Sequence, residues 1–233
     1  MDRWESLSDA DLDNRITLVS SSVSLAVADV EDLADLTARI NAKVVRDIED
    51  PQTLRGLVRY ALGVDLSDDE RAAHLHTWVD VINDRIDSDA DEQRDIKTEL
   101  ARRHSGGAAE LDAPGRWSEF DDVDLKLRIT RDKLTIRFTP YDKSELGKMI
   151  DHIKRIRRRR AVESGRRRGG SAVIGDSLVI RMMIRTAAGR DLPPAQKREW
   201  VDMVADRIIS VLELAGDERQ DIEAELQRRR TAP

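Results

Sequence analysis

The sequence predicts an α+β fold in which one unit, a β-hairpin followed by about four helices, occurs twice in tandem. Three observations lead to this prediction. The chain matches itself when it is shifted by 113 residues, and again when it is shifted by 126 residues. Apolar residues alternate near the start of each of the two copies, as they do in strands. Farther along, they recur at the spacing of amphipathic helices.

Two long segments of the chain match later segments without a gap. Residues 3–40 align with residues 116–153, with 11 identities in 38 positions. Residues 55–103 align with residues 181–229, where DEQRDIKTELARR matches DERQDIEAELQRR. Two collinear matches over most of the chain indicate an internal duplication.

The duplication predicts how the chain is divided. We expect copy one at residues 1–105, a linker containing Gly and Pro at residues 106–115, and copy two at residues 116–233. The second shift exceeds the first by 13, so copy two has 13 additional residues. They coincide with an Arg-Gly insertion near residues 154–170.

Each copy begins with a predicted hairpin. In copy two, apolar residues alternate over residues 123–129 and again over residues 134–138, with a turn at residues 132–133. Copy one shows a weaker alternation, with a serine turn at residues 20–22. An isolated two-stranded hairpin is only marginally stable, so we expect the hairpins to join one sheet or to pack under their own helices.

Four helices follow each predicted hairpin. The first has an apolar stripe that is present in both copies: Leu33, Leu36 and Ile40, matched by Leu146, Met149 and Ile153. The second runs from Asp50 to Gly63, and its counterpart from Asp176 to Gly189. The third and fourth begin near Ser67 and Asp91, and their counterparts near Pro193 and Asp217. Trp4 and Trp117, at equivalent positions, are expected to anchor the chain to each core.

The composition limits the classes of function. The chain has no cysteine, which excludes thiol catalysis, cysteine-based zinc sites and disulfides, and favours a reducing cytoplasm. No apolar run is long enough to predict a signal peptide or a membrane span. His74 and His76 lie two apart on a helix and cannot form a metal pair, and no known catalytic motif occurs. We therefore expect a non-enzymatic protein without metal or cofactor.

Charge is distributed very unevenly along the chain. Residues 1–115 carry 13 basic and 26 acidic side chains, whereas residues 116–233 carry 27 basic and 20 acidic side chains. The basic half is expected to face a polyanion. Alternatively, the acidic half of one chain meets the basic half of another and the protein forms a homo-oligomer.

The most basic segment extends from Lys154 to Gly170 and contains nine basic residues and one acid. Arginine guanidinium groups bind phosphate oxygens bidentately, which favours nucleic acid as the partner. The chain has only eight aromatic residues, so phosphate contacts are expected to dominate over base stacking. The predicted nucleic-acid-binding residues are Arg155, Arg157, Arg158, Arg159, Arg160, Arg166, Arg167 and Arg168. The alternative is a structural or adaptor protein in which this segment contacts an acidic protein surface.

Overall fold

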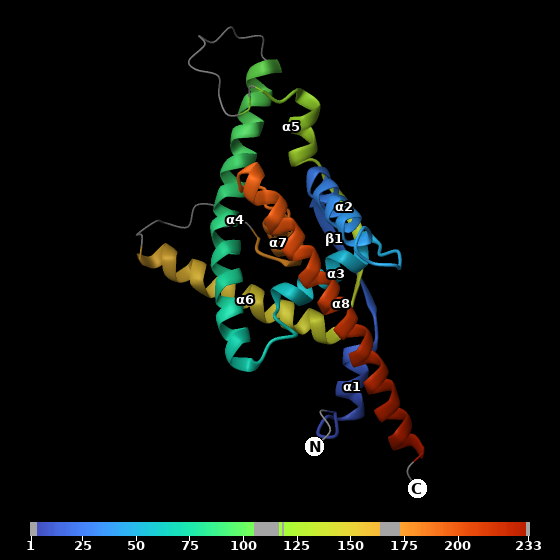
Figure 1. The fold of residues 1–233 in the computed structure, drawn as a ribbon. Coiled ribbons are helices and arrows are strands. Elements are labelled where there is room, and N and C mark those ends of the chain that lie inside the picture. The colour runs from blue at the N-terminus through green and yellow to red at the C-terminus, as the bar shows by residue number, and fades with distance from the viewer. Residues whose placement is uncertain (1–3, 105–116, 118, 164–172, 232–233) are drawn as a thin grey trace.

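The computed structural model describes residues 4–104, 117, 119–163 and 173–231, and within these ranges the protein is mainly helical. The first five elements are α1 (Asp9–Ile16), β1 (Val19–Ala26), α2 (Val27–Asn41), α3 (Asp50–Ala61) and α4 (Asp68–His104). The next five are α5 (Asp122–Ile129), β2 (Arg131–Phe138), α6 (Pro140–Glu163), α7 (Asp176–Ala187) and α8 (Pro194–Thr231) (Figure 1). The prediction of an α+β fold with a hairpin and four helices in each copy is therefore wrong.

The described residues contain a single two-stranded sheet, and its strands come from different halves of the chain. β1 pairs antiparallel with β2, with Val19 opposite Phe138 and Ala26 opposite Arg131. We call this pair of strands the ribbon. The predicted serine turn lies inside β1, and the predicted linker at residues 106–115 lies outside the described residues.

The segments predicted as the first strand of each hairpin are short helices. Asp121 caps α5, where its carboxylate accepts hydrogen bonds from the backbone N–H groups of Val123 and Asp124 at 2.7 and 2.8 Å. Leu125 and Ile129 alternate along the sequence but are also one helical turn apart, so a helix places both toward α4. The same spacing misled the prediction at α1, which Ser8 caps.

The later helices lie close to the predicted positions, but there are fewer of them. The six apolar residues of the predicted stripe lie in α2 and α6, and all are buried. α3 and α7 end before Gly63 and Gly189, which have φ angles of 60° and 58°. The predicted third and fourth helices of each copy form one continuous helix, α4 or α8. α4 contains no glycine or proline, and α8 continues through Gly216, which lies just before the predicted start at Asp217.

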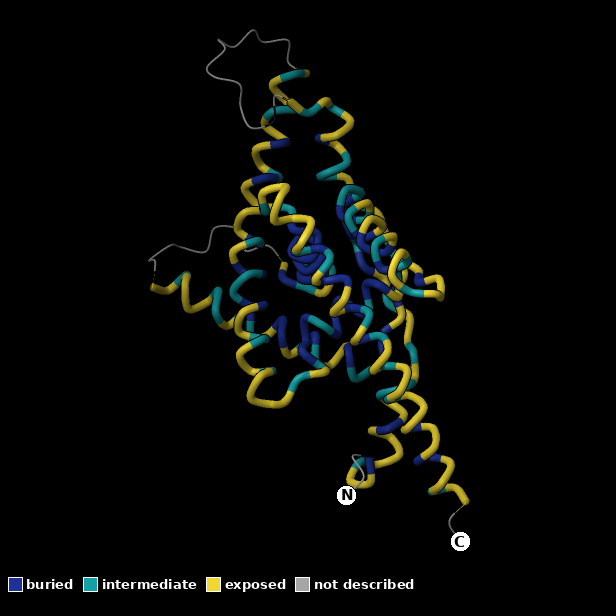
Figure 2. Tube along the Cα trace, in the orientation of Figure 1, coloured by how far each residue is buried: buried dark blue, intermediate teal, exposed yellow. Residues whose placement is uncertain are grey.

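The two halves of the chain are interleaved. α4 packs against α5, α6 and α7, whereas α8 packs against α1, α2 and α3. β1 contacts α7 and β2 contacts α3, so the ribbon also joins the halves. Figure 2 shows the buried residues gathered at the centre, with the ends of α4, α6 and α8 largely exposed. The main hydrophobic core contains residues from both halves.

Two smaller clusters lie at the ends of the long helices. Trp4 is 4% exposed and packs with Leu12 against Ile222 and Leu226 of α8. Trp117 is 6% exposed and packs with Leu125 against Ile96 of α4. Each tryptophan therefore contacts the long helix of the other half. None of the helices in the described ranges has both the length and the hydropathy needed to cross a membrane.

Candidate anion-binding surfaces

The predicted nucleic-acid-binding arginines are divided by the structure. Arg155 and residues 157–160 lie in the last turns of α6. Arg166, Arg167 and Arg168 lie outside the described residues. The arginines on α6 divide again, because they occupy different faces of the helix.

Arg157 and Arg160 face α4 and bind its acidic side. Arg157 forms an ion pair with Asp87 and donates a hydrogen bond to the backbone carbonyl of Asn83 at 3.2 Å. Arg160 lies 3.0 Å from Asp84, measured between Nη1 and Oδ1. These two arginines therefore hold the end of α6 against α4 and are occupied within the chain.

Arg155, Arg158 and Arg159 are exposed and lie on one face of α6, as residues three and four positions apart do in a helix. Within the part of the chain that the structure describes, none of the three makes an ion pair. We call these residues the arginine face. The helix places the three arginines along one side, so an incoming phosphate meets several cations together.

Buried ion pairs join the two halves of the chain. Asp142 has a completely buried side chain and lies 2.7 Å from Arg59 and 3.3 Å from Arg55. Arg59 reaches the carboxylate of Glu218 at 2.7 Å with its other terminal nitrogen. Burial lowers the pKa of Arg59, but the carboxylates of Asp142 and Glu218 outweigh burial and raise it above its usual value. We call this group the Asp142 network.

A second buried group, the Asp29 network, lies between α2, α4 and α7. The Asp29 carboxylate lies 2.9 Å from Arg185, 3.2 Å from Arg181 and 3.1 Å from Arg190. Arg185 also reaches Asp89 of α4 at 2.8 Å. Burial raises the pKa of Asp29, but the positive charges of Arg185 and Arg190 outweigh burial, so this pKa lies below its usual value.

Both networks connect residues of the acidic half to residues of the basic half. The same is true of Arg157 and Arg160, which contact α4, and of Arg39 and Lys43 of α2, which contact Asp202 and Asp206 of α8. The Asp29 network and the pairs of Arg157 and Arg160 join acids of the acidic half to arginines of the basic half. In the Asp142 network and the two α2 pairs, the basic side chain belongs to the acidic half. These ion pairs therefore do not explain the uneven charge of the sequence, and the predicted self-assembly stays a prediction.

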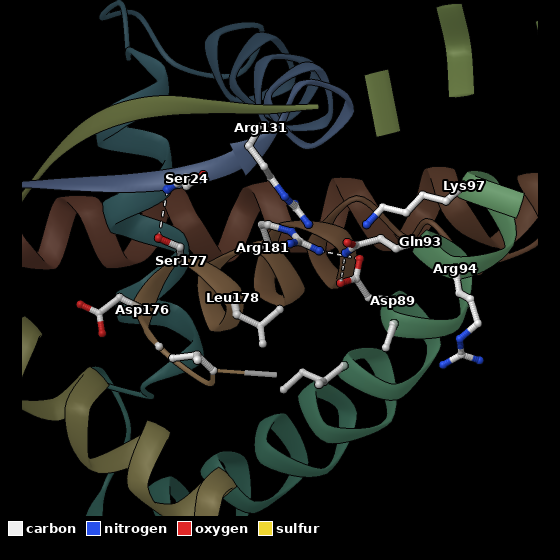
Figure 3. Close-up of a pocket in the computed structure, with 14 residues that line it drawn as sticks. Ser24, Asp89, Gln93, Arg94, Lys97, Arg131, Asp176, Ser177, Leu178 and Arg181 are labelled. Atoms are coloured by element: carbon white, nitrogen blue, oxygen red, sulfur yellow. Dashed lines mark hydrogen bonds and ion pairs between the residues drawn. The ribbon is translucent and has the colours of Figure 1, made fainter. Parts of the chain in front are cut away.

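A cavity of about 740 Å³ lies beside the Asp29 network, between α4, the start of α7 and one end of the ribbon. Its polar lining includes Ser24, Asp89, Lys97, Arg131, Ser177 and Arg181 (Figure 3). The sequence prediction missed this site because it placed Arg131 beside a hairpin turn. The strand that brings Ser24 to Arg131 comes from the other half of the chain.

The outer face of the ribbon is polar and exposed. Its exposed residues are Ser20, Ser22, Lys133, Thr135 and Arg137, and paired positions place them on the same side of the sheet. The inner face is apolar and joins the main core. The outer face is a second solvent-accessible surface with two cations.

The described residues contain no group of three or more His, Asp or Glu side chains arranged to hold a metal ion. Comparisons with protein-family models, with curated proteins and with solved structures found no match to this chain. The chemistry of these surfaces is therefore the basis for a functional proposal.

Proposed function

We propose that this protein binds nucleic acid without catalysing a reaction, and that the arginine face of α6 contacts the phosphate backbone. The observation that supports the proposal is the division of the α6 arginines. Arg157 and Arg160 hold the end of α6 against α4, whereas Arg155, Arg158 and Arg159 are exposed on one face of the helix. Arg166, Arg167 and Arg168 follow in the sequence and are proposed to add further phosphate contacts.

The arrangement favours contacts with phosphate over contacts with bases. The chain has two phenylalanines, two tyrosines and four tryptophans, and the arginine face includes none of them. Trp4, Trp78 and Trp117 are buried, so they offer no platform on which a base could stack. We therefore expect binding that depends little on sequence and strongly on salt, because phosphate neutralisation releases counterions.

The test is a binding titration of fluorescent duplex DNA, single-stranded DNA and duplex RNA at several salt concentrations. The variant replaces Arg155, Arg158 and Arg159 with serine. Loss of three phosphate contacts should weaken binding at low salt by at least tenfold. On duplex DNA, the fall of log K with log salt should also become less steep by about 2 to 3, because each phosphate contact contributes roughly 0.9 to its steepness.

A matched control separates location from net charge. Arg46, Arg198 and Arg207 are exposed and make no ion pair among the described residues, so their replacement by serine removes the same charge elsewhere. The control should bind within about twofold of the parent protein. Equal losses in both variants would show that only net charge matters and would contradict the proposal. Absence of binding at low salt would also contradict it.

A third variant tests the competing surface. Replacement of Lys133 and Arg137 by serine removes the two cations of the outer ribbon face. A two-stranded ribbon can enter the major groove of DNA, so this face is the principal competitor. If the ribbon variant loses binding while the variant of the arginine face keeps it, the proposed contact is wrong.

A further inference from the structure

The cavity beside the Asp29 network is lined by four cations, Arg94, Lys97, Arg131 and Arg181, and by two carboxylates, Asp89 and Asp176. In Figure 3 Asp176 lies away from Arg131 and Lys97. Asp89 shares Oδ1 between Arg181 and Arg185, and its Oδ2 accepts a hydrogen bond from Gln93 at 2.7 Å. Both oxygens of this carboxylate are therefore occupied. Arg131, which also lines the cavity, makes no ion pair with Asp89 or with any other described residue.

Arg131 is the clearest sign of a missing partner. Its Nη1 atom is buried and has no hydrogen-bond partner among the described residues. Burial lowers the pKa of this guanidinium, and the nearby positive charge of Arg181 lowers it further. A buried donor of this kind is costly unless something accepts its hydrogen bond.

Other donors face the same space. In Figure 3 the side-chain tips of Arg131, Lys97 and Arg181 point toward one region, whereas Arg94 points away from it. Lys97 makes no ion pair within the described ranges. Ser177 accepts a hydrogen bond from the backbone N–H of Ser24 at 3.0 Å, so its own hydroxyl proton is free to be donated to an anion.

The sequence repeat indicates that these cations are not needed to pack the elements. Leu18, 113 positions before Arg131, lies at the corresponding junction between α1 and β1. Glu223, 126 positions after Lys97, lies on α8. A leucine and a glutamate therefore replace the arginine and the lysine at the matched positions. The cationic pair is specific to this cavity.

We propose that the cavity binds a small phosphate monoester, with the phosphate held between Arg131 and Lys97. Two surplus cations match the charge of a phosphate dianion, and an arginine binds two phosphate oxygens at once. Ile86, Leu178 and Val173 line the remainder of the cavity and would contact an apolar group attached to the phosphate. The volume of about 740 Å³ lies within the range of small-molecule sites.

Isothermal titration calorimetry with inorganic phosphate and with phenyl phosphate tests this site. We expect one site per chain, and tighter binding of phenyl phosphate because its ring contacts the apolar lining. Arg131→Leu, which introduces the residue found at position 18, should weaken phenyl phosphate binding at least tenfold. Its melting temperature without ligand should not fall, because Arg131 loses no partner.

Two further variants make the result decisive. Lys97→Ser changes an exposed side chain and should fold normally, yet it should weaken binding about as much as Arg131→Leu. Arg94→Ser removes one charge at the cavity rim and should leave affinity within about twofold. Absence of binding to the parent protein, or unchanged affinity in Lys97→Ser, would overturn the proposal. Equal affinity for the two probes would contradict the role of the apolar lining.

This site is separate from the arginine face of α6. The variant that replaces Arg155, Arg158 and Arg159 should bind phenyl phosphate normally. Loss of phenyl phosphate binding in that variant would show that the ligand sits on α6 and not in the cavity. The cavity proposal and the nucleic-acid proposal can therefore fail independently.

Discussion

Asp29 and Asp142 have completely buried side chains, and each is surrounded by arginines from the other half of the chain. A buried carboxylate is expensive to desolvate, and its arginines repay this cost only while they remain in contact with it. Removing one partner leaves the other charge buried and uncompensated. These residues therefore fix how α2 and α6 sit against α7 and α3, even where a salt bridge adds little net stability.

The Asp29 network gives a prediction on stability. Asp29→Asn keeps the shape of the side chain but leaves Arg181, Arg185 and Arg190 without their shared carboxylate. We expect the free energy of unfolding, measured in urea at pH 7, to fall by about 3–5 kcal/mol. Asp35→Asn, on an exposed position of the same helix, should change it by less than about 0.5 kcal/mol.

The pKa of Asp29 also predicts how the stability difference between the parent protein and Asp29→Asn changes with pH. Arginine charges hold the pKa of Asp29 below the usual 3.8 despite burial. The stabilisation from this depressed pKa is complete above the unfolded-state pKa and is lost as the pH falls through the folded-state pKa. The difference between the parent protein and Asp29→Asn should therefore shrink in melts recorded from pH 5 down to pH 3. A difference that stays constant over this range would contradict the assigned ion pairs.

Helices were easier to predict from the sequence than strands. Caps and glycine stops are local signals, and they locate α3 and α7 to within two residues; the apolar stripe places Leu33, Leu36 and Ile40 in a helix without giving the bounds of α2. The strands could not be found in this way. Eight-residue segments with alternating apolar residues also fit short helices, and nothing local to Ser20 or Ser22 indicates that the partner strand lies more than 100 residues away.

The pairing of the strands can be tested with cysteines, because the chain has none of its own. Ser22 lies opposite Thr135 in the ribbon. The double variant Ser22→Cys with Thr135→Cys should form an intrachain disulfide under mild oxidation, detected by proteolysis and mass spectrometry. A hairpin within residues 123–138 would instead bring Thr130 close to Thr135.

The control pair is therefore Thr130→Cys with Thr135→Cys. Five residues of extended strand separate these positions by about 16 Å, too far for a disulfide, whose Cα atoms lie within about 7 Å. Efficient closure of the control pair, or failure of the Ser22 pair, would restore the hairpin and refute the ribbon.

At the scale of the whole molecule, the sequence repeat marks the charged residues of the two buried networks, which no local pattern identifies. The repeat leaves Asp29, Arg55, Arg59 and Glu92 identical at their matched positions, and these residues and their counterparts form the two networks. Composition alone located the basic segment of the candidate site. Which arginines are exposed could not be predicted, because that depends on where α4 lies against α6.

The interleaving predicts that neither half folds alone. Residues 1–105 expressed separately would bury Asp29 without its arginines and would leave β1 without a partner strand. We expect each of the fragments 1–105 and 106–233 to show weak, non-cooperative thermal unfolding by circular dichroism. When mixed in equal amounts they should form a complex that melts cooperatively. Cooperative melting of either fragment by itself would show that the halves are independent domains.

The shared ribbon also has a consequence for synthesis. A ribosome that has completed residue 105 must add 126 more residues before α8 is complete at Thr231, which takes roughly 6 to 25 s at 5–20 residues per second. β1 stays without a partner until β2 is complete at Phe138, and the apolar face of α2 has no α8 to cover it until the end of the interval. We therefore expect chaperones to bind the nascent first half during this interval. Slow translation of residues 106–231 should prolong the period in which that half can aggregate.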